Sequence, residues 1–355
     1  MPTLSRRRLL QTLAAGMSGA ASMALSATPA STSNALTNTR ATLRPPRLKV
    51  GDTIGLVSPA SAIYEREPFA IATESLQALG FKVKEGKYLR ARLGRFAGSD
   101  VQRAEDLNAL FADPEVNGIL AITGGSGATR ILKLLDYELI RRHPKCLAGY
   151  SDITALINAI YMRSGVVTFH APLGVSEWND FSVGYFRRVL MEGEAVTFKN
   201  PAERDGLLAQ TRGRIQTIRG GRARGRLLGG NLAVLTTLLG TPFLPDFRGA
   251  ILFIEEINEY IYRVDRMLSH LRLAGVFDQL AGVVIGQFTD CKPGDGFGSL
   301  PLDDVFDDYF KGLNIPVFSG SLFGHTKLKF TLPVGLDAEM DADNGTLMLL
   351  QPAVV

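Results

Sequence analysis

Cysteine and histidine are scarce in this chain: its 355 residues include two cysteines and four histidines. Two thiols are too few for a disulfide framework, and Cys146 and Cys291 match no zinc-binding spacing. Whether they pair with each other stays open, because a disulfide requires a suitable Cα separation. The sequence also contains no His-Glu-x-x-His motif and no internal repeat. We therefore expect neither a metal nor a cofactor.

Acidic residues are absent from the N-terminal part of the chain: none occurs before Asp52. The stretch from Ser5 to Leu10, Ser-Arg-Arg-Arg-Leu-Leu, matches the twin-arginine export pattern. Residues 9–27 then form an apolar run that polar residues and glycines interrupt, so it falls short of a membrane-spanning helix. We predict that residues 1–35 are a signal peptide and spacer and that the protein is periplasmic or secreted, with no stable membrane span after signal removal. An uncleaved N-terminal anchor is the alternative.

The net charge of +4 originates mainly in this leader. Without its three arginines, the chain has 36 basic and 35 acidic residues. No basic stripe with interleaved aromatic residues remains, so we predict no nucleic-acid partner. The composition, 46% hydrophobic and 21% charged, is that of a globular protein and excludes a mainly disordered or multispan chain.

Short apolar runs alternate with helical segments, which predicts an α/β fold with a parallel, doubly wound sheet. We expect an N-terminal α/β domain at 47–197, a polar, glycine-rich linker or edge loop at 198–224 and a C-terminal domain at 225–355. The residues after Pro316 favour additional β-structure. The expected strands lie at 53–57, 81–84, 118–122, 147–150, 166–169, 250–255 and 282–286. The expected helices lie at 68–79, 104–111, 128–135, 153–163 and 264–273.

A strand-to-helix corner at residues 149–154, Gly-Tyr-Ser-Asp-Ile-Thr, presents Ser151 as a candidate nucleophile. Such a corner exposes a hydroxyl at the carboxyl edge of a sheet, and the helix N-terminus adds donors for an oxyanion. The sequence lacks the second glycine of Gly-x-Ser-x-Gly. Alternatively, Ser151 or Asp152 serves only as a helix cap.

A serine nucleophile needs a base, and two of the four histidines suit that role. His170 follows an expected strand and would face a cleft, whereas His325 lies in a glycine-flanked turn that would present its imidazole. His143 lies in a charged loop, and His270 lies within an expected helix. We interpret these last two as a solvated and a structural residue.

A carboxylate should orient the imidazole, and Glu255 and Glu256 close the apolar strand at 250–254. Side chains alternate along a strand, so one member of the pair should point toward the site. A surface salt bridge with downstream arginines is the other interpretation.

The turn Thr123 to Arg130 follows a strand and opens a helix, superficially like a dinucleotide-binding loop. Arg130 stands where that motif requires its last glycine, so a nucleotide is not favoured. The turn instead provides backbone N–H groups, at Gly124 or Gly125, for an oxyanion beside the serine. A simple tight turn explains it equally well.

Taken together, these segments resemble the LD-carboxypeptidase (muramoyltetrapeptide carboxypeptidase) family of serine peptidases, which includes relatives that confer immunity to microcin C. The resemblance extends from about Leu48 to Gln351. The segments that carry it are residues 49–60, Gly124-Gly125, residues 149–154, residues 169–172, residues 229–232, residues 252–256, residues 262–266 and residues 323–326.

The resemblance implies a catalytic triad of Ser151, Glu255 and His325. It also implies an N-terminal parallel α/β domain, a C-terminal α+β domain with a small β-barrel, and a homodimer. In the corresponding mechanism, the backbone N–H groups of Asp152 and of Gly124 or Gly125 bind the oxyanion. The chain departs from many members at Thr123, where arginine is usual, and at Ala171, where glycine is usual; both departures concern substrate preference.

The function implied is removal of the terminal D-alanine from murein tetrapeptides in peptidoglycan turnover or recycling, with a murein peptide as the partner. One alternative keeps the triad and hydrolyses an acyl-aminoacyl or peptidyl conjugate, as the microcin-immunity peptidases do. A periplasmic solute-binding protein is an alternative of another class, because it also has two α/β lobes and a leader. An inactive murein binder is a further alternative.

Overall fold

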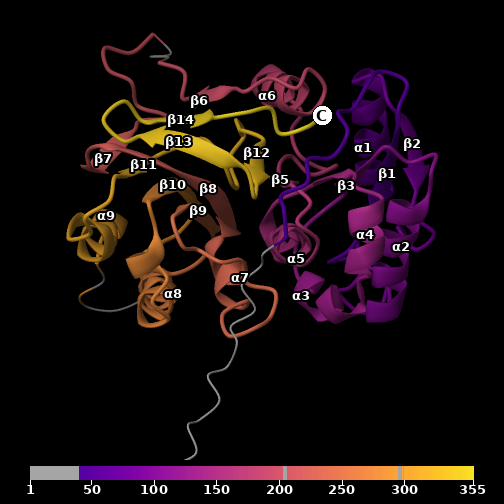
Figure 1. The fold of residues 1–355 in the computed structure, drawn as a ribbon, viewed down its shortest axis with the longest axis horizontal. Coiled ribbons are helices and arrows are strands. Elements are labelled where there is room, and N and C mark those ends of the chain that lie inside the picture. The colour runs from indigo at the N-terminus through magenta and orange to yellow at the C-terminus, as the bar shows by residue number, and fades with distance from the viewer. Residues whose placement is uncertain (1–39, 203–205, 295–297, 299) are drawn as a thin grey trace, which may run out of the picture. The chain divides into compact units, whose positions relative to one another are not determined.

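The computed structural model describes residues 40–202, 206–294, 298 and 300–355. The predicted signal peptide and spacer at 1–35 lie outside these residues. In the described part of the chain, no helix is long and apolar enough to cross a membrane. From Arg40 onward, the described residues belong to one compact unit that contains both sheets (Figure 1).

The first sheet is the parallel, doubly wound sheet that the sequence predicts. Its order is β12-β5-β4-β3-β1-β2; β5 to β2 are parallel, and β12 pairs antiparallel with β5. Successive strands are added on one side of β1 for β2 and on its other side from β3 onward, and ligands of such sheets bind at the carboxyl ends of the strands beside this switch point. The strands are β1 (Thr53–Val57), β2 (Lys82–Glu85), β3 (Gly118–Ala121), β4 (Cys146–Ala148), β5 (Thr168–His170) and β12 (Leu332–Val334).

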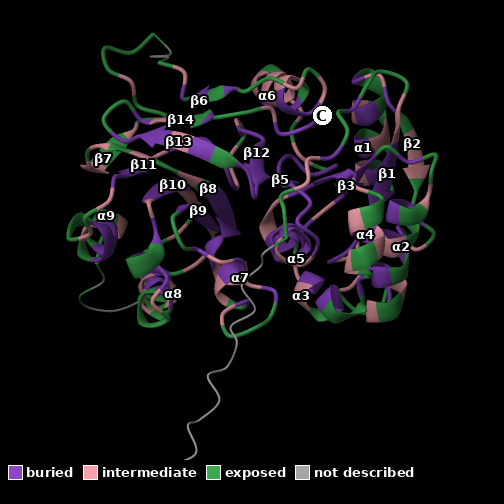
Figure 2. Cartoon of the chain, viewed as in Figure 1, coloured by how far each residue is buried: buried purple, intermediate pink, exposed green. Residues whose placement is uncertain are grey.

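The central strands form because their residues are apolar and lie between helices. Every residue of β3, β4 and β5 is buried, as expected for a parallel sheet covered on both faces. Figure 2 shows buried positions gathered in the strands and exposed positions on the outer faces of α2 and α4. The helices are α1 (Glu67–Ala78), α2 (Asp100–Ala112), α3 (Ala128–Ile131), α4 (Tyr137–Arg142), α5 (Thr154–Ser164), α6 (Asp180–Leu190), α7 (Leu232–Thr236), α8 (Ile261–Leu273) and α9 (Leu302–Phe306), with short helical turns η1 (Leu132–Leu134), η2 (Ser151–Ile153), η3 (Phe277–Gln279) and η4 (Asp307–Lys311).

The second sheet is mixed and has the order β6-β14-β13-β8-β9-β10-β11-β7. Its four central strands, β8 to β11, are parallel, and its outer strands are antiparallel. This order runs from one edge strand to another, so the small β-barrel of our prediction is not confirmed. The strands are β6 (Thr197–Lys199), β7 (Gln216–Arg219), β8 (Arg222–Asn231), β9 (Ala250–Ile257), β10 (Gly282–Thr289), β11 (Val317–Ser319), β13 (Asp337–Asp341) and β14 (Thr346–Leu349).

Residues 198–224 contribute to the two edges of this second sheet, through β6 and β7, and to the start of β8. Their polar composition suits edge strands, which natural proteins protect with charged side chains. The domain boundaries at 47–197 and 225–355 stay predictions.

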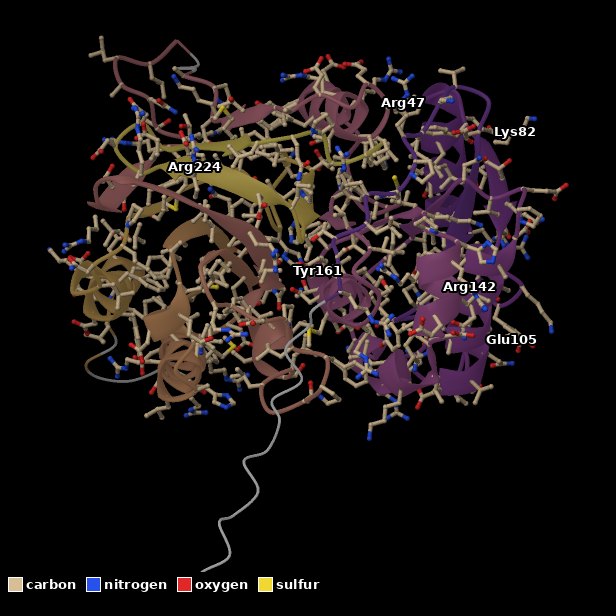
Figure 3. All side chains as sticks on the ribbon, viewed as in Figure 1. Arg47, Lys82, Glu105, Arg142, Tyr161 and Arg224 are labelled. Atoms are coloured by element: carbon tan, nitrogen blue, oxygen red, sulfur yellow. The ribbon has the colours of Figure 1, made fainter. Side chains whose placement is uncertain are left out.

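The two sheets are joined by direct contacts between α5 and β8. Asn158 donates to the carbonyl of Gly229, and the backbone N–H of Asn231 donates to the hydroxyl of Thr154. The ring of Tyr161, labelled in Figure 3, lies on the β8 side of α5, 6.0 Å from the guanidinium of Arg226. These contacts bring the nucleophile corner against the strands that carry the predicted carboxylate.

Candidate active site

Ser151 lies at the start of η2, shortly after the end of β4 at Ala148, in a strained backbone conformation. Its φ is +64°, in the left-handed region that residues other than glycine seldom occupy. Neither η2 nor α5 has a side-chain cap, so Ser151 and Asp152 do not cap the helix that follows them. The corner therefore presents the serine hydroxyl at the carboxyl edge of the sheet, in the manner of a nucleophile elbow.

His325 lies between Ser151 and Glu255, although the three residues are far apart in the sequence. Its Nε2 is 3.1 Å from the Ser151 Oγ, and its Nδ1 is 2.8 Å from the Glu255 Oε2. The Thr289 hydroxyl at the end of β10 donates to the His325 carbonyl at 2.7 Å and fixes the backbone. The structure thus brings the three predicted residues into one hydrogen-bonded row.

The alternation of side chains along β9 decides between the two adjacent glutamates. Glu255 faces His325, whereas Glu256 faces the start of α7. There Glu256 accepts hydrogen bonds from the Asn231 side chain and from the N–H groups of Ala233 and Ile257. Glu255 is therefore the member of the pair that can orient the imidazole.

Burial raises the pKa of both glutamates, but their different neighbours give opposite net shifts. Burial raises the pKa of Glu255, but the imidazoles of His170 and His325 beside it outweigh this effect and lower the pKa to about 2. Burial raises the pKa of Glu256 to about 7, because its hydrogen bonds only partly compensate. At neutral pH, Glu255 is ionised and can stabilise a protonated His325.

His170 does not line a cleft, contrary to our prediction. It is 2% exposed, and its Nε2 lies 3.7 Å from the Glu255 Oε1. Neither atom has a hydrogen-bond partner among the described residues. The strand end looked open in the sequence because nothing there predicts that Leu332 of β12 pairs with His170 and that Phe253 packs against its ring.

We expect a His170→Gln variant to lose activity mainly at acid pH. The substitution removes one of the two imidazoles that lower the pKa of Glu255, so this pKa will rise and the carboxylate will lose its charge at a higher pH than in the wild type. The part of the acid loss in kcat/KM that follows protonation of Glu255 should begin about one pH unit higher. The matched control is His270→Gln, since His270 is exposed on α8. Identical profiles for the two variants would contradict a positioning role for His170.

The glycine pair of the predicted oxyanion turn lies directly against the nucleophile. A Cβ on Gly124 would lie 2.7 Å from the Ser151 Cβ and 2.9 Å from its Oγ, so this position must be glycine. Gly125 has φ +102°, and a Cβ there would lie 2.1 Å from the Ser61 Oγ. The Asp152 carboxylate accepts from the Ala128 N–H at 2.8 Å and ties this loop to the serine corner. The predicted oxyanion donors and Ser151 are therefore adjacent.

Gly324 allows His325 to approach Glu255. Its φ is +97°, and a Cβ there would lie 2.5 Å from the Glu255 Oε2. Alanine at this position must push the His325 turn away from the carboxylate. Our sequence analysis predicted a glycine-flanked turn but not this contact, which depends on the second sheet.

We expect a Gly324→Ala variant to lose about 10²-fold or more in kcat/KM, because displacements near 1 Å have effects of that size on catalysis. The matched control is Gly240→Ala: Gly240 also has positive φ, at +74°, but a Cβ there would meet nothing within 4 Å. Comparable activity losses in both variants would mean that backbone strain, and not the clash with Glu255, is responsible.

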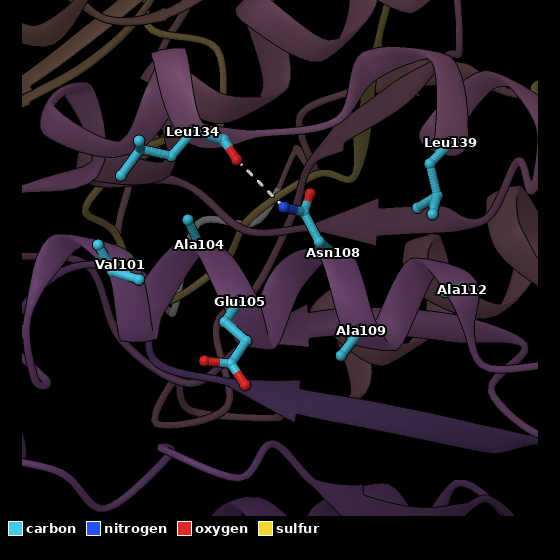
Figure 4. A pocket seen from close by; sticks show the side chains of 8 residues that line it. All are labelled: Val101, Ala104, Glu105, Asn108, Ala109, Ala112, Leu134 and Leu139. Carbon is cyan, nitrogen blue, oxygen red and sulfur yellow. Dashed lines mark hydrogen bonds between the residues drawn. The ribbon is translucent and has the colours of Figure 1, made fainter.

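Two hollows in the described part of the chain differ in their relation to this row. One, of about 790 Å³, is bordered by Thr326, next to His325, and by Gln287 and Leu322. The other, of about 510 Å³, lies over α2 and is bordered by residues such as Glu105 and Leu134 (Figure 4). No residue of the row lines either hollow, but the first is bordered by the residue next to His325 and the second by no neighbour of the row, so the first hollow is the better candidate for a substrate cleft.

The described residues hold no group of His, Cys, Asp and Glu side chains that could bind a metal ion. Cys146 and Cys291 are both free thiols, and burial raises the pKa of each. The row of Ser151, His325 and Glu255 has the arrangement of an activated serine.

Comparison with known proteins gives a consistent result. Residues 54–171 match the LD-carboxypeptidase N-terminal domain, and residues 224–340 match the LD-carboxypeptidase C-terminal domain. A probable murein peptide carboxypeptidase of Bacillus subtilis is 36% identical over 311 residues, which cover 86% of this chain and 94% of the relative.

The chain is also similar to two further proteins, one of them in both sequence and solved structure and the other in solved structure. The microcin C7 self-immunity protein MccF of Escherichia coli is 30% identical over 86% of this chain and 94% of its own length. A structure of MccF with glutamyl sulfamoyl guanosine superposes with a TM-score of 0.80, covering 88% of this chain and all of that one, at 28% identity. The muramoyltetrapeptide carboxypeptidase of Oxalobacter formigenes gives a TM-score of 0.71 at 29% identity, covering 84% and 97%. The two domain matches span more than half of the chain and, with the identity to the Bacillus subtilis relative, show that it belongs to the LD-carboxypeptidase family of serine peptidases.

Proposed function

We propose that this protein is a serine LD-carboxypeptidase that removes the terminal D-alanine from murein tetrapeptides. The observation that carries the proposal is the row of Ser151, His325 and Glu255, whose two contacts of 3.1 and 2.8 Å match the arrangement of nucleophile, base and orienting carboxylate. A solute-binding protein needs no such row and no strained serine.

The reaction begins when Ser151 attacks the carbonyl carbon of the bond to the terminal residue. His325 Nε2 takes the hydroxyl proton, and the ionised Glu255 stabilises the imidazolium through Nδ1. The tetrahedral intermediate collapses when His325 gives the proton to the leaving amine, and the terminal amino acid departs. Water, activated by the same imidazole, then hydrolyses the acyl-enzyme at Ser151 and restores the hydroxyl.

The oxyanion needs donors that already point to the attacked carbonyl. We assign this role to the backbone N–H groups of Asp152 and of Gly124 or Gly125, because both segments contact the serine corner. The positive end of the α5 helix dipole adds to the stabilisation of negative charge there.

The substrate class is inferred from two relatives that are named as murein peptide or murein tetrapeptide carboxypeptidases. The Bacillus subtilis relative is 36% identical to this chain, and the Pseudomonas aeruginosa relative is 29% identical. Export by the leader predicted at residues 1–35 would place the enzyme in the periplasm, beside its substrate. The homodimer implied by the family resemblance stays a prediction, which light scattering of the purified protein would measure.

A second candidate keeps the row and changes the substrate to an acyl-aminoacyl or peptidyl conjugate. It is favoured by the structural similarity to MccF, with a TM-score of 0.80. Purified protein should be incubated separately with a defined murein tetrapeptide and with an aminoacyl sulfamoyl adenosine, and the products should be identified by mass spectrometry. Loss of one alanine from the tetrapeptide supports the first function, and cleavage of the conjugate alone overturns it in favour of the second.

A further inference from the structure

Lys329, four residues beyond His325, is a buried lysine next to the proposed active site. It is 5% exposed, and its Nζ lies over the Tyr150 ring, 5.3 Å from the ring centre. The same ring packs edge-on against the His325 imidazole, at 4.8 Å between ring centres. Tyr150 therefore lies in contact with both the catalytic base and this ammonium group.

The Lys329 ammonium has no hydrogen-bond or ion-pair partner among the described residues, which is uncommon for a charge so deeply buried. Lys145 shows the usual arrangement: it is also buried, but its Nζ donates to the carbonyls of Leu110 and Asp113. Burial lowers the pKa of both lysines to about 8, so both remain mostly charged at neutral pH. Lys329 thus holds a largely buried positive charge that is favoured by Glu177 and Glu255 but that no described residue neutralises by direct contact.

The position of Lys329 is fixed by its backbone and not by its charge. Its N–H donates to the Ser182 hydroxyl at 3.1 Å, and the Asn179 side chain donates to the nearby Lys327 carbonyl at 2.8 Å. Both partners belong to the start of α6. The backbone that carries the side chain is consequently held in place before any ligand arrives, and such preorganisation lowers the entropic cost of binding.

We propose that the Lys329 ammonium binds the free C-terminal carboxylate of the residue that the enzyme removes. This proposal rests on the proposed carboxypeptidase function. A carboxypeptidase must recognise a terminal carboxylate, and this group lies one residue beyond the attacked carbonyl, about 4 Å along the chain. It is thus on the leaving-group side, where His325 delivers its proton and where the Tyr150 ring connects His325 to Lys329.

A bound carboxylate would supply the partner that Lys329 lacks. Hydrogen bonds between charged groups are about twice as strong as neutral ones, and they are strongest where water is excluded. A substrate with a C-terminal amide, or with further residues after the scissile bond, would leave the ammonium buried and unpaired. Sites with buried polar groups reject such analogues strongly. Lys329 would therefore restrict the enzyme to removing a terminal residue.

The test compares a murein tetrapeptide with its C-terminal amide as substrates. For the wild type, we expect kcat/KM on the acid to exceed that on the amide by about 10²-fold or more. Lys329→Met keeps the apolar stem without the charge, so it should lose about 10²-fold on the acid and change little on the amide. A matched variant, Lys145→Met, should retain the preference for the acid.

Stability separates a binding role from a structural one. Lys145→Met leaves two carbonyls without their donor and should lower the midpoint of thermal unfolding, whereas Lys329→Met removes an unpaired buried charge and should maintain or raise it. A Lys329→Met variant that is less stable and loses activity equally on acid and amide would overturn the proposal.

A binding measurement distinguishes failure of this proposal from failure of the proposed function. Calorimetry with the Ser151→Ala variant, with and without Lys329→Met, should show tighter binding of the peptide acid than of the amide only when Lys329 is present. If Lys329 gives this preference for the acid but the wild type does not hydrolyse murein peptides, the carboxylate site is retained and the murein substrate is rejected. Equal binding of acid and amide in the presence of Lys329 would reject the carboxylate site.

Discussion

Replacing Ser151 by alanine is expected to reduce kcat by about 10⁴- to 10⁶-fold, equivalent to about 5–8 kcal/mol of transition-state stabilisation. The reason is that the Oγ 3.1 Å from the His325 Nε2 forms the covalent bond of the acyl-enzyme, and no methyl group can replace it. Release of alanine from a defined tetrapeptide, followed by mass spectrometry under single-turnover conditions, measures the loss.

The fold should survive this change. Alanine can adopt the backbone conformation at +64° at about the same cost as serine, so the free energy of unfolding should stay within about 1 kcal/mol of the wild type. Ser75→Ala, on α1, is the matched control and should retain full turnover. A Ser151→Ala variant with wild-type kcat would eliminate Ser151 as the nucleophile.

Glu255→Gln should have the second-largest effect, a fall in kcat of about 10⁴-fold. The glutamine amide can donate to the His325 Nδ1, which would move the ring proton to Nε2 and leave that nitrogen unable to accept from Ser151. The amide also carries no charge to stabilise the imidazolium. Steady-state kinetics on the tetrapeptide at neutral pH measure the change.

Glu256→Gln is the matched control, since it makes the same chemical change one residue farther along β9. Glu256 binds Asn231 and the first turn of α7, so its substitution should affect the free energy of unfolding more than kcat. If Glu256→Gln were the more damaging variant for kcat, our assignment of the two carboxylates would be reversed.

Much of the fold could be predicted because its signals are local. The run from Thr53 to Val57, closed by Ser-Pro, predicts β1 with its observed bounds, and most other predicted bounds differ by one to four residues. β12 could not be predicted to join the first sheet, because a run as short as Leu332–Val334 contains no information about its partner. β6 and β7 could not be predicted as strands, because their residues have the polar composition that is typical of edge strands.

Active-site residues could be predicted where they follow the end of an expected strand or lie in a glycine-flanked turn. Ser151 and His325 have such local signals, whereas the choice of Glu255 over Glu256 depends on which face of β9 meets the first sheet. His170 was misplaced for a related reason, since β12 covers it. Lys329 has no sequence signal, because burial without a partner is a property of the folded chain.

The separation of the catalytic residues has a consequence for the timing of synthesis. Ser151 precedes His325 by 174 residues, so at about 5–20 residues per second the base emerges roughly 10–35 s after the nucleophile. β12, which completes the edge of the first sheet, is made later still. A nascent or truncated chain thus holds a serine without a base, and the ribosome must finish nearly the whole protein before any hydrolytic activity can exist.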